Sequence, residues 1–404
     1  MLFRSVLMPM PGTGVNPYVS VEYGANEYLR TQLALPPKQD SPWYLSATLT
    51  HDGGFRDDSG YRQYKLHVKR SGRILDGDVT FAYSMTGLDQ DTAGYILGKD
   101  AYLDRKLSRK NFNPEAFREV SSQRFYALWN RSFSHFDVDV RPFVRRSRME
   151  FLMHFLPGTP LEKNGQVSVG ALSALTFEGQ RHLTVIGADV ELADIYLEQF
   201  QAGPASGSPF LVETRPQGQQ YDYEVRSKSL ALYIQSDLFL SERWTLGAGL
   251  RFETLHYDYD NRMLSGNTRD DGTECGFGGC LYSRPADRTD QYSNLAPKIS
   301  INYRLAKDKS MYLALMRGFR APQTTELYRL QNGQQVSDLD TELIDSSSGL
   351  VVIKVGIVHV VVTGPLEPLL DHRSAIALET DAVNLHQRAV VAFKHPLPPS
   401  HPVT

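Results

Sequence analysis

The sequence has little excess charge of either sign and almost no long apolar run. Its 43 lysines and arginines nearly balance 46 aspartates and glutamates, which leaves a net charge of -3 and a pI near 6.4. That balance argues against nucleic acid as the main partner, because nucleic-acid-binding chains carry a basic patch and a high pI. One apolar stretch, 349–366, reaches the length of a membrane-spanning helix, but it contains Lys354 and His359 and is rich in Val and Ile. We therefore expect no transmembrane helix there.

Catalytic and metal-binding patterns are lacking as well. The 11 histidines are scattered, and no spacing of Cys, His and Asp suits a zinc site or an activated nucleophile. No Gly-rich phosphate loop follows a strand and opens a helix. The chain is therefore not expected to be an enzyme, and neither a cofactor nor a metal ion is expected in it.

What the sequence does contain is a regular alternation of short polar turns and long loops, with a strand between each pair. The short turns are 36–42, 69–73, 130–135, 177–181, 240–243 and 304–309, and the long loops are 51–60, 87–119, 146–165, 197–227 and 259–292. Outer-membrane barrels show this asymmetry, because they have short periplasmic turns and longer extracellular loops.

The strands between these connections alternate apolar and polar residues with a period of two. In the segment 229–239, Leu230, Leu232 and Ile234 oppose Tyr233 and Gln235. An apolar face opposite a polar one is typical of a strand that meets water on one side only. The mean hydropathy of -0.35 does not contradict membrane insertion, since lipid-facing and lumen-facing residues alternate and cancel.

We therefore predict an all-β fold, an antiparallel transmembrane β-barrel. About thirteen such strands precede Phe319, and many Tyr and Phe lie near their ends, as interfacial girdles require. Charged side chains that face the lumen indicate a wide barrel, because narrow barrels fill their interior with side chains. An odd count, in a fold that uses even counts and must close, indicates an incomplete barrel.

One motif is more specific than the alternation. The segment 317–328 reads Arg-Gly-Phe-Arg-Ala-Pro-Gln-Thr-Thr-Glu-Leu-Tyr, and related runs lie at 229–235, 244–253 and 295–300. Together they resemble the TonB-dependent outer-membrane receptor family, in which such a strand end leads into an extracellular loop. The motif residues are Arg317, Gly318, Phe319, Arg320, Ala321, Pro322, Glu326, Leu327 and Tyr328. The resemblance covers about Pro17 to Asp345 and implies a barrel of the large 22-stranded type.

The resemblance also implies a function. Members of this family take up a scarce nutrient across the outer membrane of Gram-negative bacteria, most commonly a ferric siderophore. The implied partners are the TonB energy-transducing complex, contacted through a plug domain, the ferric siderophore or similar chelate, and outer-membrane lipid. A passive outer-membrane porin or structural barrel is one alternative, and a soluble β-rich binding module is another.

The family pattern breaks at both ends of the chain. Strands begin near Pro17 without a plug domain, and residues 1–16 contain no secretory signal, so we interpret them as a remnant or artefactual N-terminus. Residues 17–346 are assigned to a partial barrel. Residues 347–404 lose the alternation, which a reading-frame shift near Ser346 explains better than a new domain does. We expect a fragment that neither closes nor transports.

Candidate ligand contacts lie where one strand runs into a long loop. Four arginines cluster there: Arg141, Arg145, Arg146 and Arg148. By alternation Arg141 and Arg145 face the lumen near its outer mouth, where they would attract an anionic chelate. The alternatives are binding of lipopolysaccharide phosphates and solvation of the loop. The apolar segment 148–157 is expected to fold inward with Met153 and His154 as ligand contacts, or else to pack against neighbouring loops.

Two further motifs lie in or next to long loops. Cys275 and Cys280 enclose Gly-Phe-Gly-Gly. A close pair in an exported protein most simply forms a disulfide that rigidifies the loop, whereas a metal site would need further ligands. Tyr-Asp-Tyr occurs at 221–223 and again at 257–259, where we expect interfacial tyrosines beside solvated aspartates, with calcium binding as the alternative.

Overall fold

The computed structural model describes residues 16–38, 41–154, 158–306, 309–355 and 358–360. Within them, fifteen strands form one antiparallel sheet in which each strand pairs with the next along the chain. The strands of this sheet are β1 (Tyr18–Tyr23), β2 (Leu29–Leu35), β3 (Trp43–Asp52), β4 (Tyr61–Ile74), β5 (Gly77–Asp91), β6 (Phe117–Ser132), β7 (Asp137–Leu152), β8 (Leu161–Gly179), β9 (His182–Gln201), β10 (Gly218–Phe239), β11 (Trp244–Asn261), β13 (Arg288–Ala306), β14 (Lys309–Arg320), β16 (Glu342–Val355) and β17 (Val358–Val360).

The remaining elements are short and lie in the connections. They are η1 (Ala101–Leu103), α1 (Arg105–Arg109), α2 (Pro209–Thr214), α3 (Thr324–Tyr328), η2 (Val336–Asp338), and the two-stranded ladder of β12 (Tyr282–Ser283) with β15 (Leu330–Gln331). No helix among the described residues has the length and apolar character needed to cross a membrane.

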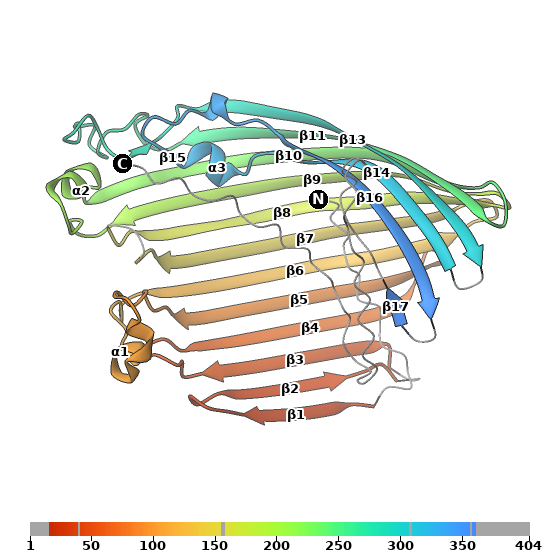
Figure 1. Cartoon of the computed structure of the whole chain (residues 1–404), viewed down its shortest axis with the longest axis horizontal. Coiled ribbons are helices and arrows are strands. Elements are labelled where there is room, and N and C mark those ends of the chain that lie inside the picture. The colour runs from red at the N-terminus through yellow and green to blue at the C-terminus, as the bar shows by residue number, and fades with distance from the viewer. Residues whose placement is uncertain (1–15, 39–40, 155–157, 307–308, 356–357, 361–404) are drawn as a thin grey trace, which may run out of the picture.

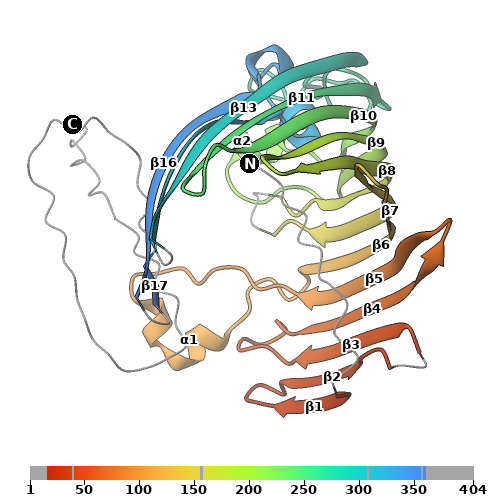
Figure 2. The same ribbon diagram turned by 90° about the vertical axis from the view of Figure 1, so that its right-hand side faces the viewer.

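The sheet curls into a trough-shaped wall. Figure 1 shows the strands lying side by side from β1 to β13, with β14 and β16 curving down in front of them, and Figure 2 shows the resulting curved section. In the described part of the chain, β1 pairs only with β2 and β17 only with β16, so the wall stays open. The predicted antiparallel barrel fold is confirmed, and thirteen strands of the main sheet begin before Phe319, as the alternation predicted.

The two edges of the wall differ, as predicted, although the expected long loops 51–60 and 146–165 are only the short connections 53–60 and 153–160. Five of the hairpin connections along one edge, after β2, β4, β6, β8 and β10, span at most seven residues, and we call this the short-turn edge. The long connections after β5, β9, β11 and β14 lie along the other edge, the long-loop edge. All three α-helices lie at the long-loop edge (Figure 1).

One predicted turn is wrong. Residues 69–73 lie inside β4, and the hairpin turns at Leu75 and Asp76, whose φ angles are 50° and 57°. Two successive residues with positive φ form a type I′ turn, whose twist matches that of the flanking strands. Asn-Gly is the usual sequence for this turn, so Leu75 and Asp76 predict it only weakly. Ser71 and Gly72 are residues typical of turns, and they place the predicted turn too early in the chain.

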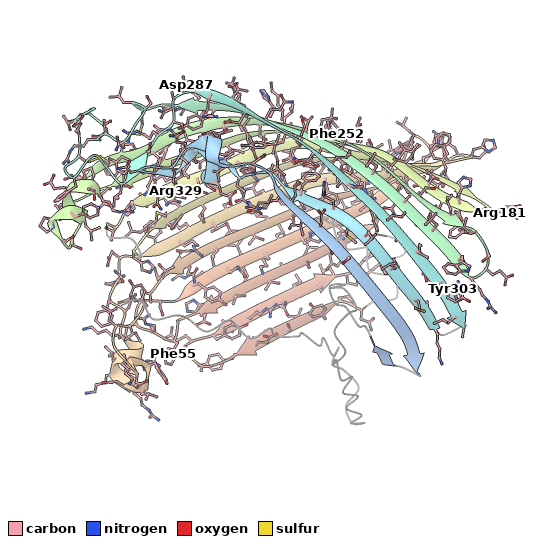
Figure 3. The ribbon with its side chains drawn as sticks, turned by 45° about the horizontal axis from the view of Figure 1, so that its top comes forward. Phe55, Arg181, Phe252, Asp287, Tyr303 and Arg329 are labelled. Atoms are coloured by element: carbon pink, nitrogen blue, oxygen red, sulfur yellow. A yellow bond between two sulfur atoms is a disulfide. The ribbon has the colours of Figure 1, made fainter. Side chains whose placement is uncertain are left out.

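The wall has two unlike faces. The outer face carries an apolar belt of exposed side chains across successive strands, including Val144, Val169, Leu192 and Leu232, between 48% and 55% exposed. At the short-turn edge the belt ends in aromatic side chains, where the rings of Trp244 and Tyr303 lie 4.4 Å apart (Figure 3). An apolar band that ends in an aromatic girdle is the surface that a barrel presents to lipid.

The expected boundary at Ser346 does not end the sheet. β16 pairs with β14 in an unbroken register from Glu342 opposite Arg320 to Ile353 opposite Lys309. Strand pairing uses the backbone, and a run rich in Val and Ile favours a strand even without alternation. Residues 1–15 of the expected N-terminal remnant and 361–404 of the expected tail lie outside the described residues.

Candidate functional site

The loop that follows β14, residues 321–341, folds inward over the inner face, and we call it the inner loop. The residue before it, Arg320 at the end of β14, donates to Glu326 in α3 at 2.8 Å and to Glu342 in β16 at 2.7 Å. Glu326 also accepts from the backbone N–H of Gln323 at 2.7 Å, as in a capping box. The hydrogen bond from Arg320, with that from Gln323, holds the pKa of Glu326 below its usual value. The family motif thus sets the start of the inner loop.

A cluster of tyrosines anchors α3 to the sheet. The ring of Tyr328 stacks on Tyr259 at 4.2 Å and meets Tyr223 and Tyr257 edge-on at 6.2 and 6.4 Å. The Tyr328 hydroxyl donates to Asp290 at 2.9 Å. Burial raises the pKa of Tyr328, so this donor stays protonated. The two Tyr-Asp-Tyr motifs therefore supply a loop anchor on the inner face, and not the interfacial tyrosines that we expected.

Arg329 extends the inner loop across the trough. Its guanidinium lies 3.1 Å from the carboxylate of Glu162 in β8 and 3.4 Å from Sδ of Met153, just beyond β7. Glu162 is 3% exposed, and its other carboxylate oxygen accepts a hydrogen bond from Asn164 at 2.8 Å. Figure 3 shows Arg329 beneath the curved strands, on the side of the long-loop edge. One loop thereby connects β14 with the β7–β8 hairpin.

The loop between β11 and β13 packs beside the inner loop. β12 pairs with β15, and the hydroxyl of Tyr221 donates to the carbonyl of Leu330 at 2.6 Å. Arg284, 2% exposed, donates to the backbone carbonyls of Leu264, Gln220 and Thr268 at 2.7 to 3.1 Å. A disulfide joins Cys275 and Cys280, whose Cα atoms are 5.0 Å apart. The two loops thus form one packed unit.

A pocket of about 500 Å³ opens at the inner loop. The side chains around it include both charges and amides: Arg320, Thr325, Glu326, Arg329, Gln334, Asp340 and Glu342. Pockets that hold small molecules are mostly of this size or larger, and a few placed polar groups fix the ligand. This lining suits a polar ligand that both donates and accepts hydrogen bonds. Among the described residues, no group of three or more His, Cys, Asp or Glu is placed to hold a metal ion.

Arg141 and Arg145 lie on the inner face, but they do not lie near the outer mouth. β7 leaves the short-turn edge at Asp137, so Arg141 is only the fifth residue of the strand. Arg141 is paired with Asp139, and Arg145 with Glu191. The charged alternation indicated a strand that ends near Arg145, but β7 continues to Leu152, so the outer mouth lies farther along the strand than either arginine.

The other predicted contacts lie apart from these two: Arg148 is on the opposite face, and the neighbouring residues Met153 and His154 lie beyond the end of β7. Arg148 lies on the outer face, with the same parity along β7 as the belt residue Val144. Met153 is buried beside Arg329, and His154 lies 3.5 Å from the hydroxyl of Thr92. Twelve residues of extended chain separate Arg141 from Met153, roughly 40 Å, so the five predicted residues do not form one site.

The sequence motif contains Arg320, Pro322 and Glu326, which line the pocket, but it does not contain Arg329 or the residue that holds it, Glu162. Glu162 and Arg329 are single charged residues far apart in the chain, and neither lies in a recognisable motif. A signal existed for the tyrosine cluster, because Tyr221, Tyr223, Tyr257 and Tyr259 share one face by their period of two. These tyrosines could have been assigned to the inner face from the parity of the exposed belt.

Comparison with known proteins agrees with this fold. A family model described as "TonB dependent receptor-like, beta-barrel" matches residues 16–347. Similar solved structures include the copper transporter OprC (TM-score 0.63, 12% identity), the ferric citrate transporter FecA in its unliganded form (0.61, 12%) and the siderophore receptor PiuA from Acinetobacter baumannii (0.64, 11%). They match 84%, 81% and 84% of this chain, which in turn covers 51%, 47% and 55% of theirs.

The chain therefore spans about half the length of these solved relatives. No curated protein matches the sequence significantly. Barrels of this family reside in the Gram-negative outer membrane, and its members are receptors or transporters. The family match covers most of the sequence, so the chain belongs to the TonB-dependent receptor β-barrel family.

Proposed function

We propose that this chain forms the barrel wall and the ligand-binding loops of an outer-membrane receptor. The receptor takes up a ferric siderophore or similar chelate by TonB-dependent active transport. The observation that carries the proposal is the pocket formed by the inner loop at the long-loop edge, which is lined by charged, amide and apolar side chains. It lies on the inner side of a wall whose outer face is apolar and exposed. A ligand arriving from outside the cell would meet this pocket first.

The chemistry of the pocket supports a metal chelate as ligand. Arg320 and Arg329 are held by carboxylates of the chain, while the side chain of Gln334 offers both a donor and an acceptor to a polar chelate. Met153, which the guanidinium of Arg329 contacts, and the next residue, His154, remain proposed contacts for a larger ligand. The related structures named for copper, ferric citrate and a siderophore support a metal or its chelate as cargo.

The polar inner face of the wall supports the proposal of an energy-coupled receptor, since it offers a hydrated surface against which a plug domain can pack. Arg251 pairs with Asp189 at 2.7 Å and with Glu253 at 2.8 Å, and Arg145 pairs with Glu191. Neutralised charges of this kind allow water and a polar domain to fill the interior. The TonB energy-transducing complex would act through that plug domain, as the family assignment implies.

Ligand binding can be tested on this chain alone, in detergent micelles. Ferric citrate, a ferric catecholate and a ferric hydroxamate are titrated while the quenching of intrinsic fluorescence is recorded. At least one should bind saturably, and Arg329→Gln should weaken it about tenfold, because this variant loses the ion pair that holds the pocket-forming inner loop against Glu162. Arg181→Gln, at the short-turn edge, is the matched control. Equal affinity of wild type and Arg329→Gln would refute the pocket assignment.

Two further measurements address the alternatives. A passive porin would let a neutral sugar enter proteoliposomes of the complete receptor at a rate that is independent of TonB. A soluble binding module would stay in the buffer when the chain is partitioned against detergent. The exposed apolar belt favours partition into detergent instead.

A further inference from the structure

The tripeptide Asn-Gly-Gln occurs twice in the chain, at 164–166 and at 332–334, and these hold its only two Asn-Gly pairs. An asparagine before glycine readily loses its side-chain amide. The reason is that glycine has no Cβ to hinder its backbone nitrogen as that nitrogen attacks the neighbouring side-chain carbonyl. Because the two segments share the same three residues, a difference in their reactivity must come mainly from the fold.

Asn332 lies in an exposed turn of the inner loop, directly after β15 (Figure 1). The backbone N–H of Gln334 donates to the carbonyl of Gln331 at 3.0 Å, and Gly333 has a φ of 86°, as at the third position of a type II turn. A Cβ built on Gly333 would meet no atom within 4 Å. Among the described residues, none forms a hydrogen bond with the side chain of Asn332 or with the N–H of Gly333. The two groups that must react are therefore exposed and unbonded.

Asn164 lies instead inside β8, in the middle of the wall. Both Asn164 and Gly165 pair with β7 on one side and with β9 on the other. The side chain of Asn164 donates to Glu162 at 2.8 Å. A Cβ on Gly165 would lie 2.6 Å from the carbonyl oxygen of Ser147, so there is no free space around this peptide. Rotation of the peptide toward the side chain would break the ladder, so the reaction must wait for local opening of the sheet.

We propose that Asn332 is a site of spontaneous deamidation, which adds a negative charge beside the pocket of the inner loop. The nitrogen of Gly333 gives its proton to hydroxide and attacks Cγ of Asn332. The new C–N bond closes a succinimide ring, and the Cγ–Nδ2 bond breaks as the amide nitrogen takes a proton from water and leaves as ammonia. Water then opens the ring at either carbonyl. Cleavage between Cγ and the nitrogen gives aspartate, and cleavage between the main-chain carbonyl carbon and the nitrogen gives isoaspartate. Water is the only co-reactant.

The new carboxylate would stand at the rim of the pocket. Asn332 lies between Leu330 and Gln334, which both line it. The charged side chains of that lining are Arg320, Arg329, Glu326, Asp340 and Glu342. Three carboxylates already face two guanidinium groups, so a further negative charge disfavours an anionic chelate. This effect on the ligand rests on the proposed function, whereas the deamidation itself does not.

The reaction can be followed by mass spectrometry on the full chain in detergent micelles, in mildly alkaline buffer. Trypsin cleaves after Lys163 and after Arg329, so the two asparagines fall in separate peptides, and a digest at time zero gives the background. Each deamidated peptide gains the mass difference between an amide NH2 and a hydroxyl. We expect Asn332 to react at least about tenfold faster than Asn164, because the ladder around Asn164 must first open.

The same incubation in guanidinium chloride is the control. Once the ladder is gone, the two identical tripeptides should react at similar rates, which assigns the difference to the fold. Equal rates in the folded chain would overturn the proposal. So would an unreacted Asn332 in a folded chain whose denatured form deamidates, or a difference that persists undiminished in guanidinium chloride.

Two variants measure the effect on the pocket. Asn332→Gln must close a larger, less favourable ring and should stay unmodified, whereas Asn332→Asp carries the charge from the start. Ferric citrate should bind to Asn332→Asp about threefold more weakly than to Asn332→Gln, and added salt should reduce the difference. Equal affinities of the two variants at low salt would overturn the effect on the pocket. Absence of chelate binding to the wild type would refute the proposed function instead, and the mass measurement tests the deamidation separately.

Discussion

Arg329 reaches Glu162 across the trough, with its guanidinium 3.1 Å from the carboxylate, and so ties the inner loop to β8. Because Glu162 is only 3% exposed, removing its partner leaves a buried charge without compensation. We expect Arg329→Gln to weaken the attachment of the inner loop by about 2–3 kcal/mol. Hydrogen exchange of the amides at 324–331 should then be faster by about the corresponding factor.

A control separates this contact from an ordinary surface pair. Arg269 and Glu213 lie 3.3 Å apart with their side chains 32% and 50% exposed, so Arg269→Gln should cost less than about 1 kcal/mol. If both substitutions change exchange in the inner loop equally, or neither does, the contact between Arg329 and Glu162 does not hold the loop.

Tyr328 contributes both an aromatic surface and a hydrogen bond. Tyr328→Phe keeps the stacking on Tyr259 and loses only the bond to Asp290, which should cost about 1 kcal/mol. Tyr328→Ala also empties the space between Tyr223 and Tyr257, which should cost about 3–5 kcal/mol. The rate of limited proteolysis within 321–341 should therefore rise from wild type to Tyr328→Phe and again to Tyr328→Ala. Cleavage of the Phe variant at the rate of the Ala variant would assign the anchoring to the hydrogen bond instead.

The sequence predicted the wall because the wall is a local, periodic structure. The alternation around Leu230 and Leu232 shows which residues face lipid, and the lengths of the connections show which edge they lie on. Even the thirteen strands before Phe319 could be counted in this way. Each of these features depends on neighbours within a few residues, so a single sequence contains them.

The candidate site could not be predicted in the same way. The contact between Arg329 and Glu162 joins residues 167 positions apart, and it exists only because the sheet curls far enough to bring β8 under the inner loop. The distance of Arg141 from the long-loop edge depends on where β7 begins and ends. The alternation of charged and apolar residues does not show those two ends. The ends of a strand are harder to predict from a sequence than its existence, and in β7 the ends decide which arginines lie near the pocket.

Acid should loosen the start of the inner loop. The hydrogen bond from Arg320, with that from the backbone of Gln323, lowers the pKa of Glu326 in the folded chain. A carboxylate whose folded pKa is depressed stabilises the fold above its unfolded pKa, near 4.5, and loses that contribution as the pH falls through the folded value. We expect proteolysis within 321–341 to increase below about pH 4.5.

The matched variant for this pH dependence is Glu326→Gln. It lacks the titrating carboxylate, so the inner loop should be cleaved faster at neutral pH and should show a smaller change on acidification. An acid response of the same size in this variant would assign the effect to another group.

Arg284 should matter more to the loop between β11 and β13 than the disulfide does. A disulfide that closes so short a ring, between Cys275 and Cys280, contributes about 2 kcal/mol by restricting the unfolded chain. Arg284→Gln would leave the carbonyls of Leu264, Gln220 and Thr268 without their donor in a buried site, at more than about 3 kcal/mol. Hydrogen exchange across 262–287 should therefore rise more in Arg284→Gln than in the double change of Cys275 and Cys280 to Ser. The reverse order would mean that the cysteine ring, and not the guanidinium, organises the loop against which β15 and the pocket are built.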